Sequence, residues 1–365
     1  MPGSLEDSPH PSVHFEAKAP QEVVTCWAVK SIVWMAEPQV RALRGVLPSE
    51  LTVVTSAQAF LGASRDGQSV SFLDDSTLLE LDQKAAETGV SLDQVAPPSV
   101  IAICEATLQA SIGWLPTRPW LSHVVSRTML DHPLAAEHLK NVTSTLTQGA
   151  QPRLLDWLGP TIAGRRVRLA QASKRVDRLE RMSEFFDSRG TGARTIQMIR
   201  DAAEELLTNA FYDAPVSAGA VKQAISRTQD VSLPDESACD MVYGCRDDLA
   251  IVRVRDPFGS LTRQRLVEVL TRCARTDMQV EVDETMGGAG LGLWRIFSVA
   301  SFVAISVVSN RHTEFLVGIG KRAAGARPFA YSLLFRDRGG AVRRWKLLDA
   351  ESTKPTTNSI TIVTK

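Results

Sequence analysis

The sequence predicts a mixed fold, α/β in its first half and α+β in its second. From Val23 to about Gly149, short apolar runs alternate with helix-like stretches, which is typical of a doubly wound, mainly parallel sheet. Further along, Thr195–Tyr212 has the apolar spacing of an amphipathic helix. A glycine-rich segment, Gly287–Gly292, then runs directly into another helical stretch. The first observation predicts the fold of the first half, and the other two direct attention to the second half for function.

Composition and charge exclude several functional classes. The chain has 365 residues, with 41 Lys and Arg against 41 Asp and Glu, so no basic excess indicates nucleic acid as the main partner. The five cysteines form no CxxC pair, which fits a reduced, cytoplasmic protein better than a zinc site or a disulfide framework. The N-terminus has no signal-peptide pattern, and no apolar run approaches the roughly 20 residues that span a membrane. Residues 1–22 are polar and aperiodic, which predicts a flexible tail.

Residues 23–149 contain an alternating series of predicted strands and helices. The helices are expected at Gln39–Leu47, Ala57–Ser64, Leu78–Thr88 and Leu134–Leu146. The strands are expected at Ile32–Met35, Leu51–Val54, Ser69–Leu73, Val100–Cys104 and around Val124–Ser126. This alternation predicts a flavodoxin-like arrangement, in which chemistry belongs at the carboxyl ends of the strands.

The same residues resemble the receiver domain of response regulators. A receiver needs an acidic pair after its first strand, an aspartate after its third and a lysine after its fifth. Here Glu37 stands alone after the first strand, Asp74 and Asp75 end the third, and Arg127-Thr128 replaces the lysine. Polar residues at a strand end also simply begin turns. The resemblance therefore implies a degenerate receiver that serves as a scaffold rather than as a phosphoacceptor.

Residues 150–190 are expected to hold a linker and a helix. The linker contains Pro152, Gly159, Pro160 and Gly164, and a helical apolar spacing runs over Arg165–Phe186. That stripe is compatible with a helix packed on the next domain and with a helix that forms a homodimer.

The helix Thr195–Tyr212 carries a polar stripe opposite its apolar face. Asp201, Glu205 and Asn209 follow one another at intervals of four residues and therefore share one side of the helix. Asparagine has a poor propensity for a helix interior, because its side chain competes for backbone hydrogen bonds. The helix is therefore expected to turn a carboxylate and an amide toward a cavity.

Two further segments bear chemistry-related patterns. The strand Leu249–Val254 ends in Arg255-Asp256-Pro257-Phe258-Gly259, and Gly288-Ala-Gly290-Leu291-Gly292-Leu293 leads into a helix. A glycine-rich backbone entering a helix N-terminus offers free amides to phosphate oxygens. No strand precedes the glycines, so they do not form a Rossmann motif, and no P-loop sequence occurs.

Together and in this order, the three segments resemble the N, G1 and G2 boxes of the GHKL ATPase superfamily. Glu205-Leu-Leu-Thr-Asn209-Ala210 fits the N box, and Gly288–Leu293 matches the G2 box in full. Asp256-Pro-Phe-Gly259-Ser-Leu261 keeps the aspartate and first glycine of the G1 box and loses its second glycine. The resemblance implies a GHKL (Bergerat) α/β sandwich over residues 191–320.

The resemblance also implies a role for each matched residue. Asn209 would coordinate the Mg²⁺ ion that bridges the phosphates of ATP, and Glu205 would be the general base. Asp256 would accept the amino group of adenine, which favours ATP over GTP, and Gly259 would let the backbone approach the base. Gly288, Gly290, Leu291 and Gly292 would form the phosphate-binding backbone and the hinge of a lid.

Within the superfamily, the chain is closest in style to the anti-sigma serine kinases. Phe185–Gly190 matches their F-x-x-x-x-G, and no histidine lies between His138 and His312 to serve as a conventional phosphoacceptor. The resemblance implies a signalling protein that uses ATP and Mg²⁺, either as a kinase for Ser, Thr or another non-histidine acceptor or as a non-catalytic partner switch. Residues 321–365 contain strand-like runs at Tyr331–Phe335, Trp345–Leu348 and Ile360–Val363, which we expect to add edge strands to the sheet.

Overall fold

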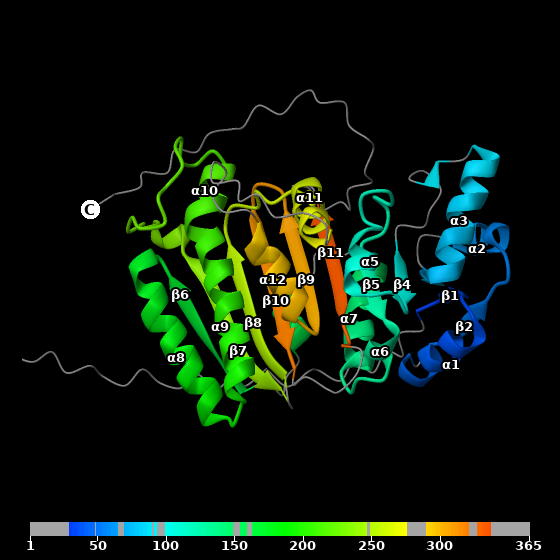
Figure 1. The fold of residues 1–365 in the computed structure, drawn as a ribbon, viewed down its shortest axis with the longest axis horizontal. Helices are drawn as coiled ribbons and strands as arrows, with labels where there is room; N and C mark the ends of the chain where they lie inside the picture. The colour runs from blue at the N-terminus through cyan, green and yellow to red at the C-terminus, as the bar shows by residue number, and fades with distance from the viewer. Residues whose placement is uncertain are drawn as a thin grey trace, which may run out of the picture.

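The described part of the chain forms one mixed sheet of eleven strands, flanked by helices (Figure 1). The computed structural model describes residues 29–47, 49–64, 69–89, 91–92, 99–148, 154–158, 163–246, 249–275, 290–320 and 327–336. The strand order is β2-β1-β3-β4-β5-β11-β9-β10-β8-β7-β6. The prediction of a mixed α and β protein is therefore confirmed. The expected flexible tail, Gly288 and the strand-like runs Trp345–Leu348 and Ile360–Val363 lie outside the described residues.

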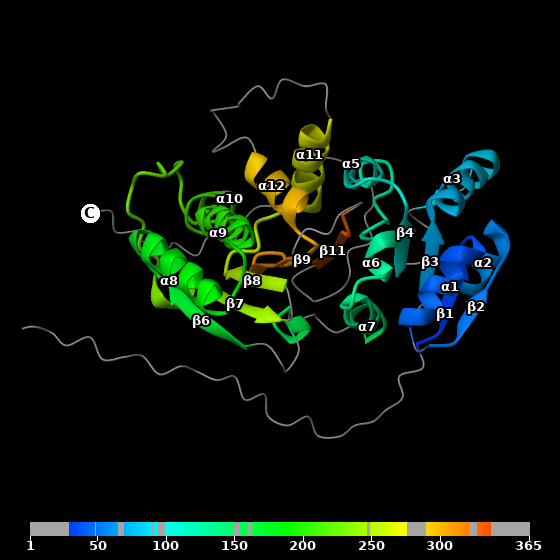
Figure 2. The same ribbon diagram turned by 60° about the horizontal axis from the view of Figure 1, so that its bottom comes forward.

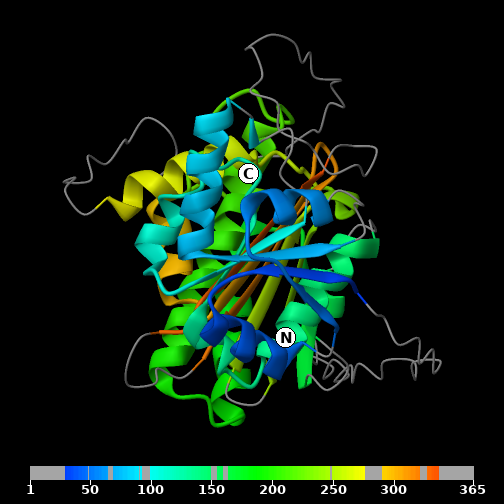
Figure 3. The same cartoon turned by 90° about the vertical axis from the view of Figure 1, so that its right-hand side faces the viewer.

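The first half contributes five parallel strands with helices on both faces, as Figure 3 shows from the side. The strands are β1 (Ser31–Trp34), β2 (Leu51–Val53), β3 (Val70–Asp74), β4 (Val100–Cys104) and β5 (His123–Ser126). The helices are α1 (Glu37–Val46), α2 (Ala57–Ala63), α3 (Asp75–Thr88), α5 (Leu108–Ile112), α6 (Arg127–Leu130) and α7 (Ala135–Gln148). Buried residues of α1 and α7 pack on one face of the strands, and those of α2, α3 and α5 pack on the other.

The second half contributes a mainly antiparallel group of strands with its long helices on one face (Figure 2). The strands are β6 (Ala163–Leu169), β7 (Cys239–Arg246), β8 (Leu249–Asp256), β9 (Phe302–Val308) and β10 (His312–Ile319). The main helices are α8 (Arg175–Ser188), α9 (Ala193–Thr208), α11 (Arg263–Ala274) and α12 (Leu291–Val299). Shorter elements are η2 (Asp156–Leu158), η3 (Ala172–Lys174), the π-helical turn η4 (Asn209–Asp213), α10 (Ala214–Ser217) and η5 (Asp235–Ser237).

Strand β11 (Ala330–Arg336) joins the two halves. It pairs antiparallel with β5 on one side and parallel with β9 on the other. Its side chains are buried on both faces, which is typical of a central strand. The prediction that this segment adds an edge strand is therefore wrong, because it closes the gap between two sheets that would otherwise expose their own edges.

The predicted helix over residues 165–186 is wrong in its first part. Residues 163–169 form the edge strand β6, and α8 begins only at Arg175. Leu179, Met182 and Phe186 of α8 are buried in the core that α8 shares with α9, so the apolar stripe is used within this chain. A homodimer through this helix stays a prediction that these contacts do not support. Among the described residues, no helix has both the length and the apolar character needed to cross a bilayer.

Candidate functional site

Helix α9 places Glu205 and Asn209 at the boundary between core and solvent. The inner face of the helix buries its residues Ile199, Ala203 and Leu206. Its outer part carries Glu205, which is half-buried like Asn209. The helix changes to the π-helical turn η4 at Asn209. A π turn inside a helix is uncommon and often lies at a functional site. The polar stripe that the sequence predicts is therefore present, and its helical geometry changes at the asparagine.

The π turn is fixed by two aromatic residues and a cation. Phe211 and Tyr212 are buried, and the Tyr212 hydroxyl donates a hydrogen bond of 2.8 Å to the Gln229 carbonyl. The guanidinium of Arg175 lies 5.0 Å from the centre of the Tyr212 ring and also donates to Thr208 at 3.1 Å. Cation–π contacts of this kind add stability where they are partly desolvated. These contacts hold the end of α9, and with it Asn209, in place.

Asp256 lies at the end of β8 and is only 8% exposed. Val252 and Val254 of the same strand belong to the core that α9 covers, so the alternation of the strand puts Asp256 on that face too. Its carboxylate accepts hydrogen bonds from the backbone of Phe258 at 2.8 Å and of Gly259 at 3.4 Å. Burial raises the pKa of Asp256 to about 6, although these backbone donors and Thr313 act in the opposite direction.

Gly259 is required by its own backbone and by a close contact. Its φ is +62°, in the left-handed region that favours glycine. A β-carbon there would lie 2.2 Å from the Val308 carbonyl oxygen and 2.8 Å from the amide nitrogens of Arg311 and His312. The structure thus explains this glycine by its packing on the turn between β9 and β10. An approach to a nucleotide base is an additional role that the resemblance implies.

The glycines at the start of α12 are also enclosed by neighbouring helices. Gly290 has a φ of +68°, and a β-carbon there would lie 2.4 Å from Cγ1 of Val269 on α11. A β-carbon on Gly292 would lie 1.8 Å from Cδ of Glu205. The Glu205 carboxyl group therefore packs directly on the first turn of α12, beside Leu291. Thus the structure brings together Glu205 and Gly292, which are distant in sequence and which the resemblance assigns to the N and G2 boxes.

Asp213 is a residue of this region that the sequence analysis missed. It ends the π turn, and burial raises its pKa to about 6, with Glu205 also raising it and Arg227 lowering it. Arg227 lies 3.5 Å from its carboxylate. The spacing of four residues from Asn209 was the available signal, since it extends the stripe of Asp201, Glu205 and Asn209. The predicted helix ended one residue too early to include it.

The described residues offer oxygen ligands rather than a complete metal cage. They contain no group of three or more His, Cys, Asp or Glu side chains that could hold a metal ion. Asn209 has Glu205 one turn before it on the helix and Asp213 at the far end of the π turn. Mg²⁺ is commonly held by one or two protein oxygens together with water and the phosphates of its nucleotide. The residue types around Asn209 therefore fit Mg²⁺ arriving with a nucleotide.

The carboxyl ends of the parallel strands carry a different polar group. Asp74 caps α3, accepting hydrogen bonds from the backbone of Ala36 at 2.6 Å and of Thr77 at 3.0 Å, and from the Ser76 hydroxyl at 2.7 Å. Burial alone would raise its pKa, but these donors outweigh burial and lower it. Asp75 accepts from the Glu105 backbone at 2.9 Å. Both aspartates thus have structural partners, and they begin helix α3 rather than a turn.

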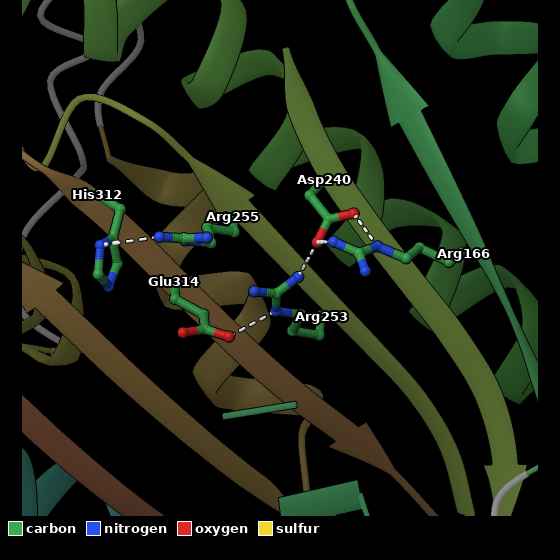
Figure 4. Close-up of polar contacts among 6 residues, drawn as sticks. All are labelled: Arg166, Asp240, Arg253, Arg255, His312 and Glu314. Carbon is green, nitrogen blue, oxygen red and sulfur yellow. Dashed lines mark hydrogen bonds and ion pairs between the residues drawn. The ribbon is translucent and has the colours of Figure 1, made fainter. Parts of the chain in front are cut away.

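A row of charged residues crosses the sheet face opposite α9 (Figure 4). Arg253 on β8 donates to Glu314 on β10 at 2.5 Å and to Asp240 on β7, which also pairs with Arg166 on β6 at 2.6 Å. Burial and nearby arginines lower the pKa of His312 to about 4, so its neutral ring can accept the hydrogen bond of 3.2 Å from Arg255. The arginines at alternate positions of β8 were the sequence signal for this row.

No family model and no curated sequence matches this chain.

Proposed function

We propose that the second half is a GHKL-type ATP-binding domain and that the protein is a signalling protein regulated by, or acting through, MgATP. The observation that carries this proposal is the contact between the Glu205 carboxyl group and Gly292. Under the N box and G2 box assignments, a catalytic carboxylate belongs near the phosphate-binding helix N-terminus. The contact supports both assignments at once.

In this proposal the nucleotide lies between α9, the end of β8 and the start of α12. Asp256 recognises the adenine amino group, and the amides at the start of α12 bind phosphate oxygens. Asn209 holds Mg²⁺, which neutralises phosphate charge during transfer. Leu261, which replaces the second glycine of the G1 box, packs partly buried against the core and so reshapes the base side of the site.

As a kinase, the protein would act on Ser, Thr or another non-histidine acceptor of a partner protein. Glu205 takes the proton of the acceptor hydroxyl as its oxygen attacks the γ-phosphorus, and the bond to the bridging oxygen breaks to release ADP. Incubation with γ-labelled ATP and a cell extract tests this chemistry. Labelling of a protein by the wild type and not by the Glu205→Ala variant supports a kinase.

The alternative is a non-catalytic switch in which MgATP changes the affinity for a partner. The altered G1 box favours it, as does Asp74, whose capping bonds leave the first half without a free phosphoacceptor at that position. In this case Glu205→Ala changes no labelling, and MgATP alters which proteins the chain retains on a column. The same variant therefore separates the two functions.

A further inference from the structure

Helix α11 lies between the two halves of the molecule. Figure 2 shows it beside α5 of the first half and α12 of the second, and it packs against both. It begins directly after the turn that follows Asp256, with Thr262 as its N-cap. The helix therefore contacts the proposed base and phosphate sides of the nucleotide site and a helix outside that site.

The first residue of α11, Arg263, donates hydrogen bonds to the backbone of the first half. Arg263 is 5% exposed, and its Nη2 donates to the carbonyl oxygens of Arg118 at 3.3 Å and Leu121 at 2.9 Å. These carbonyls belong to the loop between α5 and β5. Hydrogen bonds from a buried cation are stronger than neutral ones, so α11 and this loop are expected to move together.

A further bond ties α5 itself to the joining strand β11. The Tyr331 hydroxyl on β11 donates to the Ser111 carbonyl on α5 at 3.1 Å, in the buried interface. Thus β11 bonds to α5, and α11 bonds to the loop that follows α5.

The middle of α11 holds the start of α12. Val269 is in contact with the Cα of Gly290, and the Glu205 carboxyl group packs on Gly292 from the other side. The first turn of α12 is therefore enclosed between α11 and α9. A ligand that shifts this turn must move Val269, because a close-packed interior transmits displacement rather than absorbing it.

We propose that α11 couples MgATP binding to the conformation of α5 and of the loop over residues 113–122, so that the first half regulates the nucleotide site. This inference rests on the proposed function, since it takes MgATP as the ligand at one end. The coupling is reciprocal: whatever shifts α5 changes the affinity for MgATP by the same factor as MgATP changes the equilibrium at α5.

Hydrogen exchange on the full-length wild type tests the coupling without any substitution. Addition of MgATP at saturation is expected to slow exchange of the backbone amides over residues 108–122. A titration with MgATP in parallel establishes that nucleotide is bound. If MgATP binds and exchange over 108–122 is unchanged, the coupling is wrong; if MgATP does not bind, the proposed function itself is wrong.

A variant pair tests the route. Arg263→Met keeps most of the side-chain volume and removes the bonds to residues 118 and 121; Arg265→Met on the same helix serves as the control. Arg263→Met is expected to change the dissociation constant of MgATP by at least about fivefold, the lower end of common couplings, while Arg265→Met leaves it within twofold. Equal dissociation constants for the two folded variants overturn the proposal. If Arg263→Met does not fold, the hydrogen exchange of the wild type decides alone, since that experiment needs no substitution.

Discussion

Glu205 lies on α9 and Asn209 begins the π turn that follows it, and the proposal gives the two residues different roles. Asn209→Ala is expected to weaken MgATP binding, because the asparagine contacts the metal in the ground state. Glu205→Ala is expected to leave affinity nearly unchanged and to lower turnover about 10²–10⁴-fold, the usual contribution of a general base. Titration with nucleotide and single-turnover hydrolysis measure the two effects.

Asp201→Ala is the matched control, since Asp201 is exposed on the same helix and bonds only locally to Gln197 at 2.7 Å. Both site variants must also keep the thermal melt of the wild type. If they unfold the domain, the stripe is structural and the site assignment fails.

The raised pKa of Asp256 predicts that the stability of the protein depends on pH. Its pKa is about 6 in the folded protein, against an ordinary value of 3.8, so the folded state holds its proton more tightly than the unfolded state. Its contribution to the free energy of unfolding is greatest when the carboxyl group is protonated, and this contribution is lost as the pH rises through 6. Between pH 7.5 and pH 5 the wild type should gain about 1.4 kcal/mol from this group, roughly one pKa unit.

Asp256→Asn keeps the shape and the acceptor oxygen and removes the titration. Urea unfolding of both proteins at pH 5 and pH 7.5 isolates the effect, because other groups, Asp213 included, are common to both. An identical pH dependence in the two proteins would contradict a raised pKa at Asp256.

At the scale of secondary-structure elements, the charged row across β6, β7, β8 and β10 is expected to stabilise the sheet. Arg253 and Glu314 have side chains 5% and 3% exposed, so Arg253→Met leaves a buried carboxylate without this partner. The expected loss is about 3–5 kcal/mol of unfolding free energy. Arg166→Met removes an arginine of the same row that is 53% exposed and should cost less than about 1 kcal/mol. Chemical denaturation of the two variants measures the difference; equal losses would mean that the row is solvated.

Local sequence patterns predicted most helices and strands, but they did not predict which elements lie side by side in the fold. The boundaries expected for Val100–Cys104 coincide with β4, since this is a short, fully buried run of β-forming residues. The predicted helix includes residues of β6 because the apolar spacing of Leu169, Ala172 and Val176 continues the helical pattern of α8, whereas the period of two in β6 sets Val167 and Leu169 toward the core. In the site, the polar stripe of α9 was predictable from spacing. The π turn that follows it depends on tertiary contacts of Tyr212, which no local pattern contains.

At the scale of the molecule, the continuous sheet predicts that the two halves unfold together. One core cluster contains residues of both, from Ile32 on β1 to Tyr331 on β11. Urea unfolding followed by tryptophan fluorescence and by far-ultraviolet circular dichroism should therefore give coincident single transitions. Two resolved transitions would show that the halves are independent units, as the sequence alone suggested.

The central claim is that the site around Asp256 and Glu205 binds MgATP and selects adenine. Calorimetric titration of the full-length protein with MgATP and with MgGTP, repeated on the Asp256→Asn variant, tests it most directly. The account predicts that the wild type binds MgATP more tightly than MgGTP, because the Asp256 carboxylate can only accept a hydrogen bond from the base. It predicts that Asp256→Asn narrows this preference, because an amide can also donate. Equal affinity of the wild type for the two nucleotides, or no binding of either, would contradict the account.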